Sequence, residues 1–343
     1  MSVTAPTPVA VRRPVPVRLL VVLVLLGALA LVMALSISVG ARSIPLDRVW
    51  TLVWSPDGSD EATIVRDLRV PRTLLGLLVG AALGLAGALM QSLTRNPLAD
   101  PGLLGVNAGA SLAVVLGVML FGLSGTNAQV WPAMLGAGAA SLLVWGIGGG
   151  GGGGSPVRLA LAGAAITFAL LAAVQAVVLV DRDAFAAYRT WNVGAIAGRD
   201  IDVVTAVLPF IAVGIAGTLL LARPLNALAL GEDAGRALGA HVGRVRLASL
   251  LLIAVLCGAA TAAAGPIVFL GLTVPHVARI LVGTDHRWVL PVSALLSPVL
   301  LLGADVLGRV LERPGEIEVG IMTAILGGPA FIWLVRRKRL PRL

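Results

Sequence analysis

The chain has 343 residues, of which 58% are hydrophobic and 13% are charged, and its mean hydropathy is +0.97. Soluble domains hold about 45–50% apolar residues, so this composition excludes an ordinary soluble protein and indicates a protein of the lipid bilayer. The net charge of +9 does not indicate a nucleic-acid-binding protein, because the basic residues stand at the ends of apolar segments and no aromatic stacking surface accompanies them.

The first 18 residues are rich in proline and precede the apolar run 19–39. Arg12, Arg13 and Arg18 before this run resemble the basic start of a signal peptide. The run is longer than an ordinary signal segment and ends at a poor cleavage site, so we expect a retained first helix. Residues 1–18 are predicted to form a disordered cytoplasmic tail.

Further apolar runs follow, each long enough to cross a hydrocarbon layer of about 30 Å as a helix. The sequence therefore predicts an all-α membrane protein with about ten transmembrane helices in one domain, 19–335, followed by a basic cytoplasmic tail, 336–343. The predicted spans lie near 19–39, 72–92, 103–121, 129–147, 158–180, 201–221, 246–264, 266–282, 289–307 and 318–335.

Basic residues are distributed unevenly between the two sides of the predicted bundle. An even number of spans places both termini on one side, together with the arginine-rich tail and the basic connection between the sixth and seventh spans. Cytoplasmic loops carry an excess of Lys and Arg. The sequence therefore predicts a multi-pass membrane protein with both termini in the cytoplasm.

Two features inside the predicted spans concern packing and charge. Gly76, Gly80 and Gly84 recur every four residues, a pattern that lets neighbouring helices approach closely. Asp305 is the main ionisable residue within a span, and Arg309 lies one turn further along the same helix face. We expect the two to pair, which favours a structural role over a proton relay and weighs against an ion-coupled carrier.

No catalytic or cofactor-binding motif is complete in the sequence. The glycine run 148–154 lacks the Gly-Lys-Ser/Thr element that holds phosphates, so ATP binding by this run is not predicted. His241, His276 and His286 have no metal-ligand partner at helical spacing, and the single cysteine, Cys257, cannot form an internal disulfide. We expect no enzymatic activity, cofactor or metal in this chain.

Two outer connections, 40–71 and 181–200, combine tryptophan with mixed charge, as is typical of membrane interfaces. In the first of them, Trp50 and Trp54 are expected to anchor in the lipid headgroup region rather than to stack on a ligand.

The longest inner connection, 223–245, alternates short helical stretches with glycines at 231, 239 and 243 that we expect to end helices. Its apolar residues recur at helical spacing, namely Leu228, Leu230, Ala234, Ala237 and Leu238, beside the charged residues Glu232, Asp233 and Arg236. The pattern predicts a short amphipathic helix pair. Two interpretations of this helix pair stay open: a docking surface for a soluble partner, or a helix that lies on lipid headgroups.

Several motifs, in order along the chain, resemble the permease family of iron–siderophore and vitamin B12 ABC importers (FecCD type). They are Leu68-Arg69-Val70-Pro71-Arg72, Gly87 with Gln91, Arg95-Asn96-Pro97-Leu98-Ala99-Asp100-Pro101, Leu228-Ala229-Leu230-Gly231-Glu232 with Ala237-Leu238-Gly239, Gly271-Leu272 with Val274-Pro275-His276 and Arg279, Thr284-Asp285-His286-Arg287, Ala304-Asp305, and Glu318-Val319-Gly320-Ile321 through Gly327-Gly328-Pro329. The resemblance implies the type II importer fold, with ten helices per permease.

The resemblance also implies partners for this chain. They are a second permease copy or a paralogue, two cytoplasmic ATPase subunits that bind ATP and Mg²⁺, and an outer substrate-binding protein. It assigns the ATPase coupling role to Leu228, Leu230, Gly231, Glu232, Ala234, Arg236, Leu238 and Gly239, and the docking of acidic residues of the binding protein to Arg69, Arg72 and Arg309. Arginine suits the second role because its fork holds a carboxylate with two hydrogen bonds.

A cytoplasmic gate and a cargo follow from the same resemblance. The gate is expected at Asn96, Pro97 and Leu98 and at Ser155, Pro156 and Val157. The glycine run beside the second segment departs from the family pattern. A ferric siderophore is the expected cargo, with cobalamin or haem as alternatives. An ion-coupled carrier that works without an ATPase is the competing class.

Overall fold

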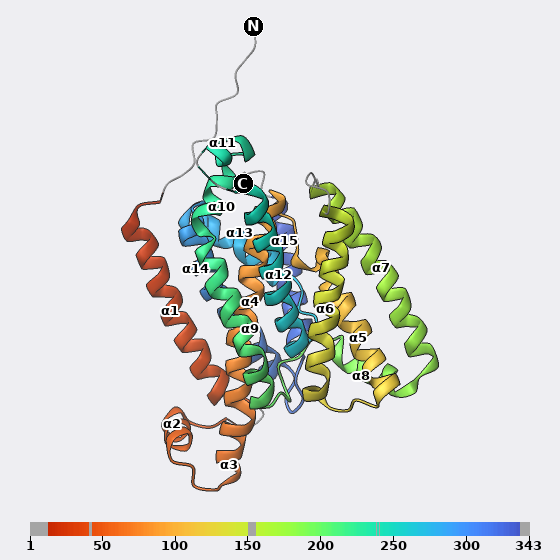
Figure 1. Ribbon diagram of the computed structural model, residues 1–343. Coiled ribbons are helices and arrows are strands. Elements are labelled where there is room, and N and C mark those ends of the chain that lie inside the picture. Colours follow the sequence, from red (N-terminus) through yellow and green to blue (C-terminus); the bar gives the residue numbers. More distant parts are fainter. Residues whose placement is uncertain (1–12, 41–42, 150–155, 238, 240, 337–343) are drawn as a thin grey trace.

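The apolar runs of the sequence form long helices that stand side by side as one bundle (Figure 1). The computed structural model describes residues 13–40, 43–149, 156–237, 239 and 241–336. Its elements are α1 (Val15–Ser38), α2 (Leu46–Trp54), α3 (Asp60–Thr63), the π-helical η1 (Ile64–Arg69), α4 (Val70–Thr94), the 3-10 turn η2 (Pro101–Leu104), α5 (Val106–Phe121), α6 (Thr126–Gly149), α7 (Pro156–Val180), α8 (Arg182–Trp191), α9 (Ile201–Leu220), α10 (Ala222–Ala229), α11 (Glu232–Ala237), α12 (Val242–Ala264), α13 (Leu270–Val282), α14 (His286–Leu311) and α15 (Val319–Arg336).

Each predicted span contains a helix, and most of these helices are long. In the part of the chain that the structure describes, seven helices are long and apolar enough to cross a membrane: α1, α4 with its extension through η1 and α3, α6, α7, α9, α12 and α14. The other three predicted spans contain the shorter apolar helices α5, α13 and α15. The all-helical membrane fold is therefore confirmed, whereas the count of about ten transmembrane helices is not.

The eighth predicted span, 266–282, shows why hydropathy overestimates helix length. The chain from Gly265 to Phe269 is not helical, and both of these residues have positive φ, +72° and +70°. A Cβ at Gly265 would lie 2.3 Å from the carbonyl oxygen of Trp191, so only glycine fits there. Pro266, Ile267 and Val268 are apolar without being helical, and α13 begins at Leu270.

Helix α4 is the most buried part of the bundle and packs against α14, α12 and α13. Its glycines make the contact with α14 close. A Cβ at Gly80 would lie 2.6 Å from the Cα of Pro298, and one at Gly84 would lie 2.6 Å from the carbonyl oxygen of Ser293. The close helix packing predicted from Gly76, Gly80 and Gly84 is confirmed.

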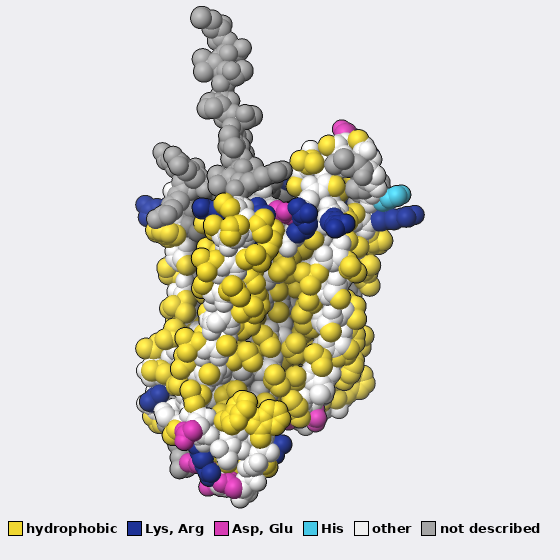
Figure 2. Space-filling view, turned by 90° about the vertical axis from the view of Figure 1, so that its left-hand side faces the viewer, with side chains coloured by type: hydrophobic (Ala, Val, Ile, Leu, Met, Phe, Trp, Pro, Cys, Tyr) yellow, Lys and Arg dark blue, Asp and Glu magenta, His cyan; other side chains and the backbone are white. Residues whose placement is uncertain are grey.

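The two ends of the bundle differ. Helices α10 and α11 lie at one end, together with both ends of the described chain, and α2 and α3 lie at the other (Figure 1). On the face shown in Figure 2, hydrophobic side chains cover the surface between the two ends, while basic side chains gather at the α10–α11 end. Helix α1 begins at Val15, before the predicted end of the tail at residue 18; residues 1–12 and 337–343 lie outside the described residues.

The connection 40–71, predicted to lie on the outer side, folds into α2, α3 and η1. One side of α2 packs inward through Val49 and Leu52, which are 5% and 0% exposed. Trp50 and Trp54 are each 70% exposed, with ring centroids 5.9 Å apart. The amphipathic form of α2 is consistent with an interfacial helix, and the headgroup anchoring of its tryptophans stays a prediction.

Candidate functional site

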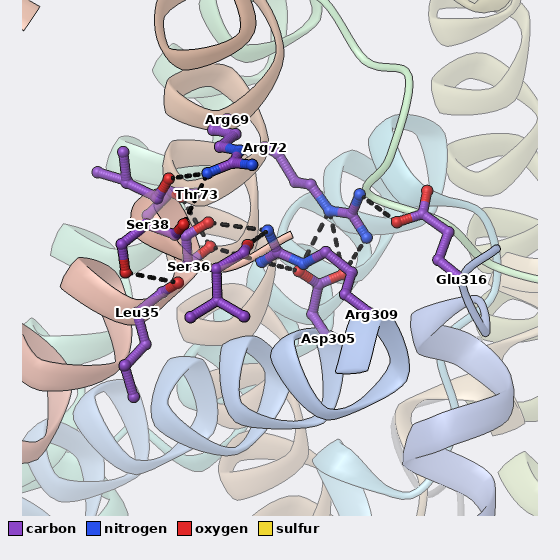
Figure 3. A network of polar contacts seen from close by, with 11 residues as sticks. Leu35, Ser36, Ser38, Arg69, Arg72, Thr73, Asp305, Arg309 and Glu316 are labelled. Atoms are coloured by element: carbon purple, nitrogen blue, oxygen red, sulfur yellow. Dashed lines mark hydrogen bonds and ion pairs between the residues drawn. The ribbon is translucent and has the colours of Figure 1, made fainter. Parts of the chain in front are cut away.

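Buried charges meet where α4 begins and α14 ends (Figure 3). Asp305 is fully buried and accepts hydrogen bonds from Arg72, whose Nε lies 3.2 and 3.1 Å from Oδ1 and Oδ2 and whose Nη2 lies 2.7 Å from Oδ1. The remaining nitrogen, Nη1, donates to Glu316 over 2.7 Å. The planar guanidinium thus holds one buried carboxylate with its fork and a second, partly exposed one with its outer edge.

Arg309 shares the same buried carboxylate. Its Nη2 donates to Oδ2 of Asp305 over 2.7 Å, so the predicted pairing of these two residues is confirmed. Its Nη1 donates to the carbonyl oxygens of Ser36 and Val39 at 2.8 and 2.9 Å. Since the last carbonyls of a helix lack intrahelical partners and form its negative end, Arg309 caps α1 while it neutralises Asp305.

Arg69 completes the cap of α1. Its Nη1 donates to the carbonyl oxygens of Ile37 and Ser38, each over 2.8 Å. The three arginines predicted to receive a binding protein therefore lie in one network, in which Arg69, Arg72 and Arg309 are 6%, 9% and 4% exposed. In the isolated chain they join α1, α4 and α14. Their docking role stays a prediction.

The predicted coupling segment lies at the opposite end of the bundle. Gly231 has φ +111° between α10 and α11, and Gly239 has φ +82° just after α11, so both end helices as predicted. The prediction for Gly243 is wrong, because this residue lies in the first turn of α12, which begins at Val242. Two glycines with positive φ, rather than three, therefore separate α10, α11 and α12.

The apolar residues of this segment do not share one face. Leu228 is 4% exposed and packs into the core, whereas Leu230 is 67% exposed. Ala234 and Arg236 are exposed, and Arg236 donates to Asp233 over 3.1 Å. Leu238 and the side chain of Glu232 lie outside the described residues. The segment thus has one leucine that anchors it to the bundle and one that faces outward.

The two predicted gate segments lie in separate connections. Asn96 follows Arg95, the left-handed C-cap of α4, and its Oδ1 accepts a hydrogen bond from the backbone N–H of Leu98 over 2.9 Å, which tightens the turn at Pro97. In the second segment Val157 is exposed in the first turn of α7. Ser155 and the side chain of Pro156 lie outside the described residues. The gate stays a prediction.

Comparisons with known proteins identify the family of the chain. A model of the FecCD transport family matches residues 28–337. The chain belongs to the FecCD transport family.

Relatives within the family are similar over most of their length. The ferric enterobactin transport system permease protein FepD of Escherichia coli (strain K12) is 51% identical over 304 residues, which are 88% of this chain and 91% of FepD. The hemin transport system permease protein HmuU of Yersinia pestis is 39% identical over 90% of this chain and 92% of its own. A metal-chelate type ABC transporter, solved in an inward-facing conformation, superimposes with a TM-score of 0.82 and 26% identity over 92% of this chain and 99% of the other. The chain is thus a multi-pass permease of this FecCD family.

Two further polar contacts in this FecCD chain were not predicted from the sequence. Arg279 is 4% exposed, and its Nη1 and Nη2 each donate over 2.7 Å to Oε1 of Gln91, which joins α13 to α4. His286, 5% exposed, lies between Ser92 of α4 and Asn226 of α10. Gln91, Arg279 and His286 stand in the quoted motifs, so the motifs contained the signal, but their spacing along the chain did not reveal their partners.

Asp285 fixes the start of α14 beside this contact. Its carboxylate accepts from the backbone N–H of Arg287 and, over 2.7 Å, from Nδ2 of Asn226. Burial alone would raise the pKa of Asp285, but the hydrogen bonds from Arg287 and Asn226 hold this pKa below its usual value. The carboxylate is therefore charged at neutral pH and stabilises the positive N-terminal end of α14.

Proposed function

We propose that this chain is the membrane-spanning permease subunit of an ATP-driven importer that moves a ferric siderophore across the bacterial plasma membrane. The observation that carries the proposal is the 51% identity with a ferric enterobactin permease protein over 88% of this chain. The lower identity to a hemin permease, 39%, supports haem as the second candidate cargo. ATP and Mg²⁺ belong to a separate ATPase subunit, and this chain transports without catalysing hydrolysis.

The α10–α11 end is the proposed docking surface for the ATPase, and it faces the cytoplasm with both termini. Three features support this orientation: the basic side chains gathered at this end, the projecting helix pair, and the exposed Leu230 (Figures 1 and 2). Leu230 would fill an apolar groove of the ATPase, while Leu228 keeps α10 attached to the bundle.

The arginine end is the proposed docking surface for the substrate-binding protein. Glu316 supports this role, because its side chain is 36% exposed while that of Asp305 is fully buried. A carboxylate of the binding protein would replace Glu316 at Nη1 of Arg72 and leave the buried pair with Asp305 intact. A second copy of this chain, or a paralogue, completes the passage for the cargo between two permeases.

Uptake of radioactive iron tests the proposal. Cells with and without this chain are given iron as a panel of ferric siderophores and as haem, and a strain with an inactive ATPase partner serves as the control. We expect loss of uptake for one siderophore class in both the deletion and the ATPase-inactive strain. Loss of haem uptake alone would change the cargo, and unchanged uptake of every compound would refute the import of ferric siderophores and haem by this chain.

A further inference from the structure

Asn226 lies on α10, where the proposed coupling segment meets the transmembrane bundle. Its Nδ2 donates to Oδ1 of Asp285 over 2.7 Å, and its Oδ1 accepts from the backbone N–H and from Nδ1 of His286 at 2.9 and 2.8 Å. The orientation of the amide is fixed, because a reversed amide would turn its oxygen toward the carboxylate of Asp285. Nδ1 of His286 is therefore the donor in this contact.

His286 extends the contact to α4. Its Nε2 lies 2.7 Å from Oγ of Ser92, and the imidazole is 5% exposed. His286 is also the first residue of α14. One buried side chain thus touches α10 on one side and α4 on the other while it belongs to a third helix.

Further contacts surround this joint. Nη2 of Arg95, at the end of α4, donates to the carbonyl oxygen of Leu228 in α10 over 3.1 Å. Arg18 of α1 lies over the ring of Trp288 at 5.8 Å and 3.9 Å from Asp285. Directional polar contacts therefore connect α10 to α4 and to the start of α14, and Arg18 joins α1 to the start of α14. Apolar packing alone is non-directional and would let α10 slide.

We infer that Asn226 and His286 form a joint that transmits a displacement of α10 to α4 and α14. The inference rests on the proposed function, in which the ATPase moves the α10–α11 segment. The inference assigns a positioning role to Asn226, His286 and Ser92. In this role they act through helix movement rather than by contact with cargo or ATP, and they set how much movement each hydrolysis event produces. Helices α4 and α14 also hold the arginine network at the far end, so the joint connects both docking ends of the bundle.

The test uses the full importer in proteoliposomes, with its ATPase and binding protein, and measures ferric siderophore molecules transported per ATP hydrolysed. Asn226→Ala is expected to lower this ratio roughly tenfold while the ATPase still turns over. Ser92→Ala, a smaller change, is expected to lower it less. Matched controls are Asn127→Ala, which removes an exposed asparagine at the far end, and Ser141→Ala, which removes a buried serine bonded only to its own helix among the contacts described.

A double-mutant cycle separates the joint from general structural support. Ser92 and Asn226 both contact His286, so the double variant should transport as poorly as Asn226→Ala alone. Additive losses, or an unchanged ratio in Asn226→Ala, would overturn the joint. If Asn226→Ala does not assemble, an unchanged ratio in Ser92→Ala would overturn it. Absence of ATP-dependent uptake by the wild-type importer would instead overturn the proposed function together with the inference.

Discussion

Replacing Asp305 with asparagine tests the buried charge network most severely. The carboxylate accepts hydrogen bonds from Arg72 and Arg309, and it is fully buried. Asparagine has nearly the same shape but no charge, and its amide group would turn hydrogen-bond donors toward two guanidinium groups. The variant therefore leaves two buried arginines with less negative charge while creating no cavity.

The magnitude follows from burial. Breaking a buried ion pair by removing one partner costs about 3–5 kcal/mol, because the remaining charge loses its compensation. Glu316→Gln is the matched control, since this carboxylate also binds Arg72 but is 36% exposed. An exposed ion pair contributes about 0–1 kcal/mol. We therefore expect the free energy of unfolding to fall by about 3–5 kcal/mol in Asp305→Asn and by at most about 1 kcal/mol in Glu316→Gln.

Equilibrium unfolding in mixed detergent micelles measures this difference. Each variant is titrated from a mild detergent into dodecyl sulfate, and helix content is followed by circular dichroism. The free energies are compared with that of the wild-type chain under the same conditions. Equal losses in Asp305→Asn and Glu316→Gln, or a loss below 1 kcal/mol in Asp305→Asn, would refute the reasoning that burial makes this carboxylate essential.

Three further predictions concern segments outside the helix core. Glu316→Gln should raise the affinity of the binding protein for this chain roughly two- to fivefold at low salt, since it removes a competing negative charge beside the arginines. Titration calorimetry at two salt concentrations checks this, and weaker binding would contradict it. Substituting valine for Gly231 (φ +111°) or Gly239 (φ +82°) should reduce the number of cargo molecules transported per ATP, because β-branched residues avoid these conformations. This number is measured in proteoliposomes, and a value equal to that of the wild-type importer would contradict the prediction. Hydrogen bonds from Ser59, with a contribution from Arg48, lower the pKa of Asp57 from 3.8 to about 2. The stability that this carboxylate gives the α2–α3 connection should therefore be complete above pH 3.8 and be lost as the pH falls through about 2. Titration of the Asp57 carboxyl group by NMR checks this, and a midpoint near 3.8 would contradict it.

The sequence predicts those parts of the fold that depend on local composition. Apolar runs locate each long helix, and glycines at four-residue spacing predict the close packing of α4 on α14. The pairing of Asp305 with Arg309 is likewise local, because the two residues lie one turn apart on a single helix.

Features that depend on backbone direction or on distant partners could not be predicted. The stretch from Gly265 to Phe269 is as apolar as a helix, but both of these residues have positive φ, and the carbonyl oxygen of Trp191, distant in sequence, leaves room only for glycine at 265. Arg72 and Asp305 are separated by 233 positions, so their pairing depends on the packing of α4 on α14. Asn226 and His286, 60 positions apart, meet for the same kind of reason.

ATP-driven accumulation of a ferric siderophore is the central claim, and one measurement tests it directly. The chain is reconstituted with its ATPase and binding protein in proteoliposomes, and uptake of ferric enterobactin is followed with ATP on the ATPase side, without ATP, and with ionophores that abolish ion gradients. Accumulation that requires ATP and is unaffected by the ionophores is the predicted result. Accumulation that continues without ATP and stops with the ionophores would show an ion-coupled carrier and contradict the account.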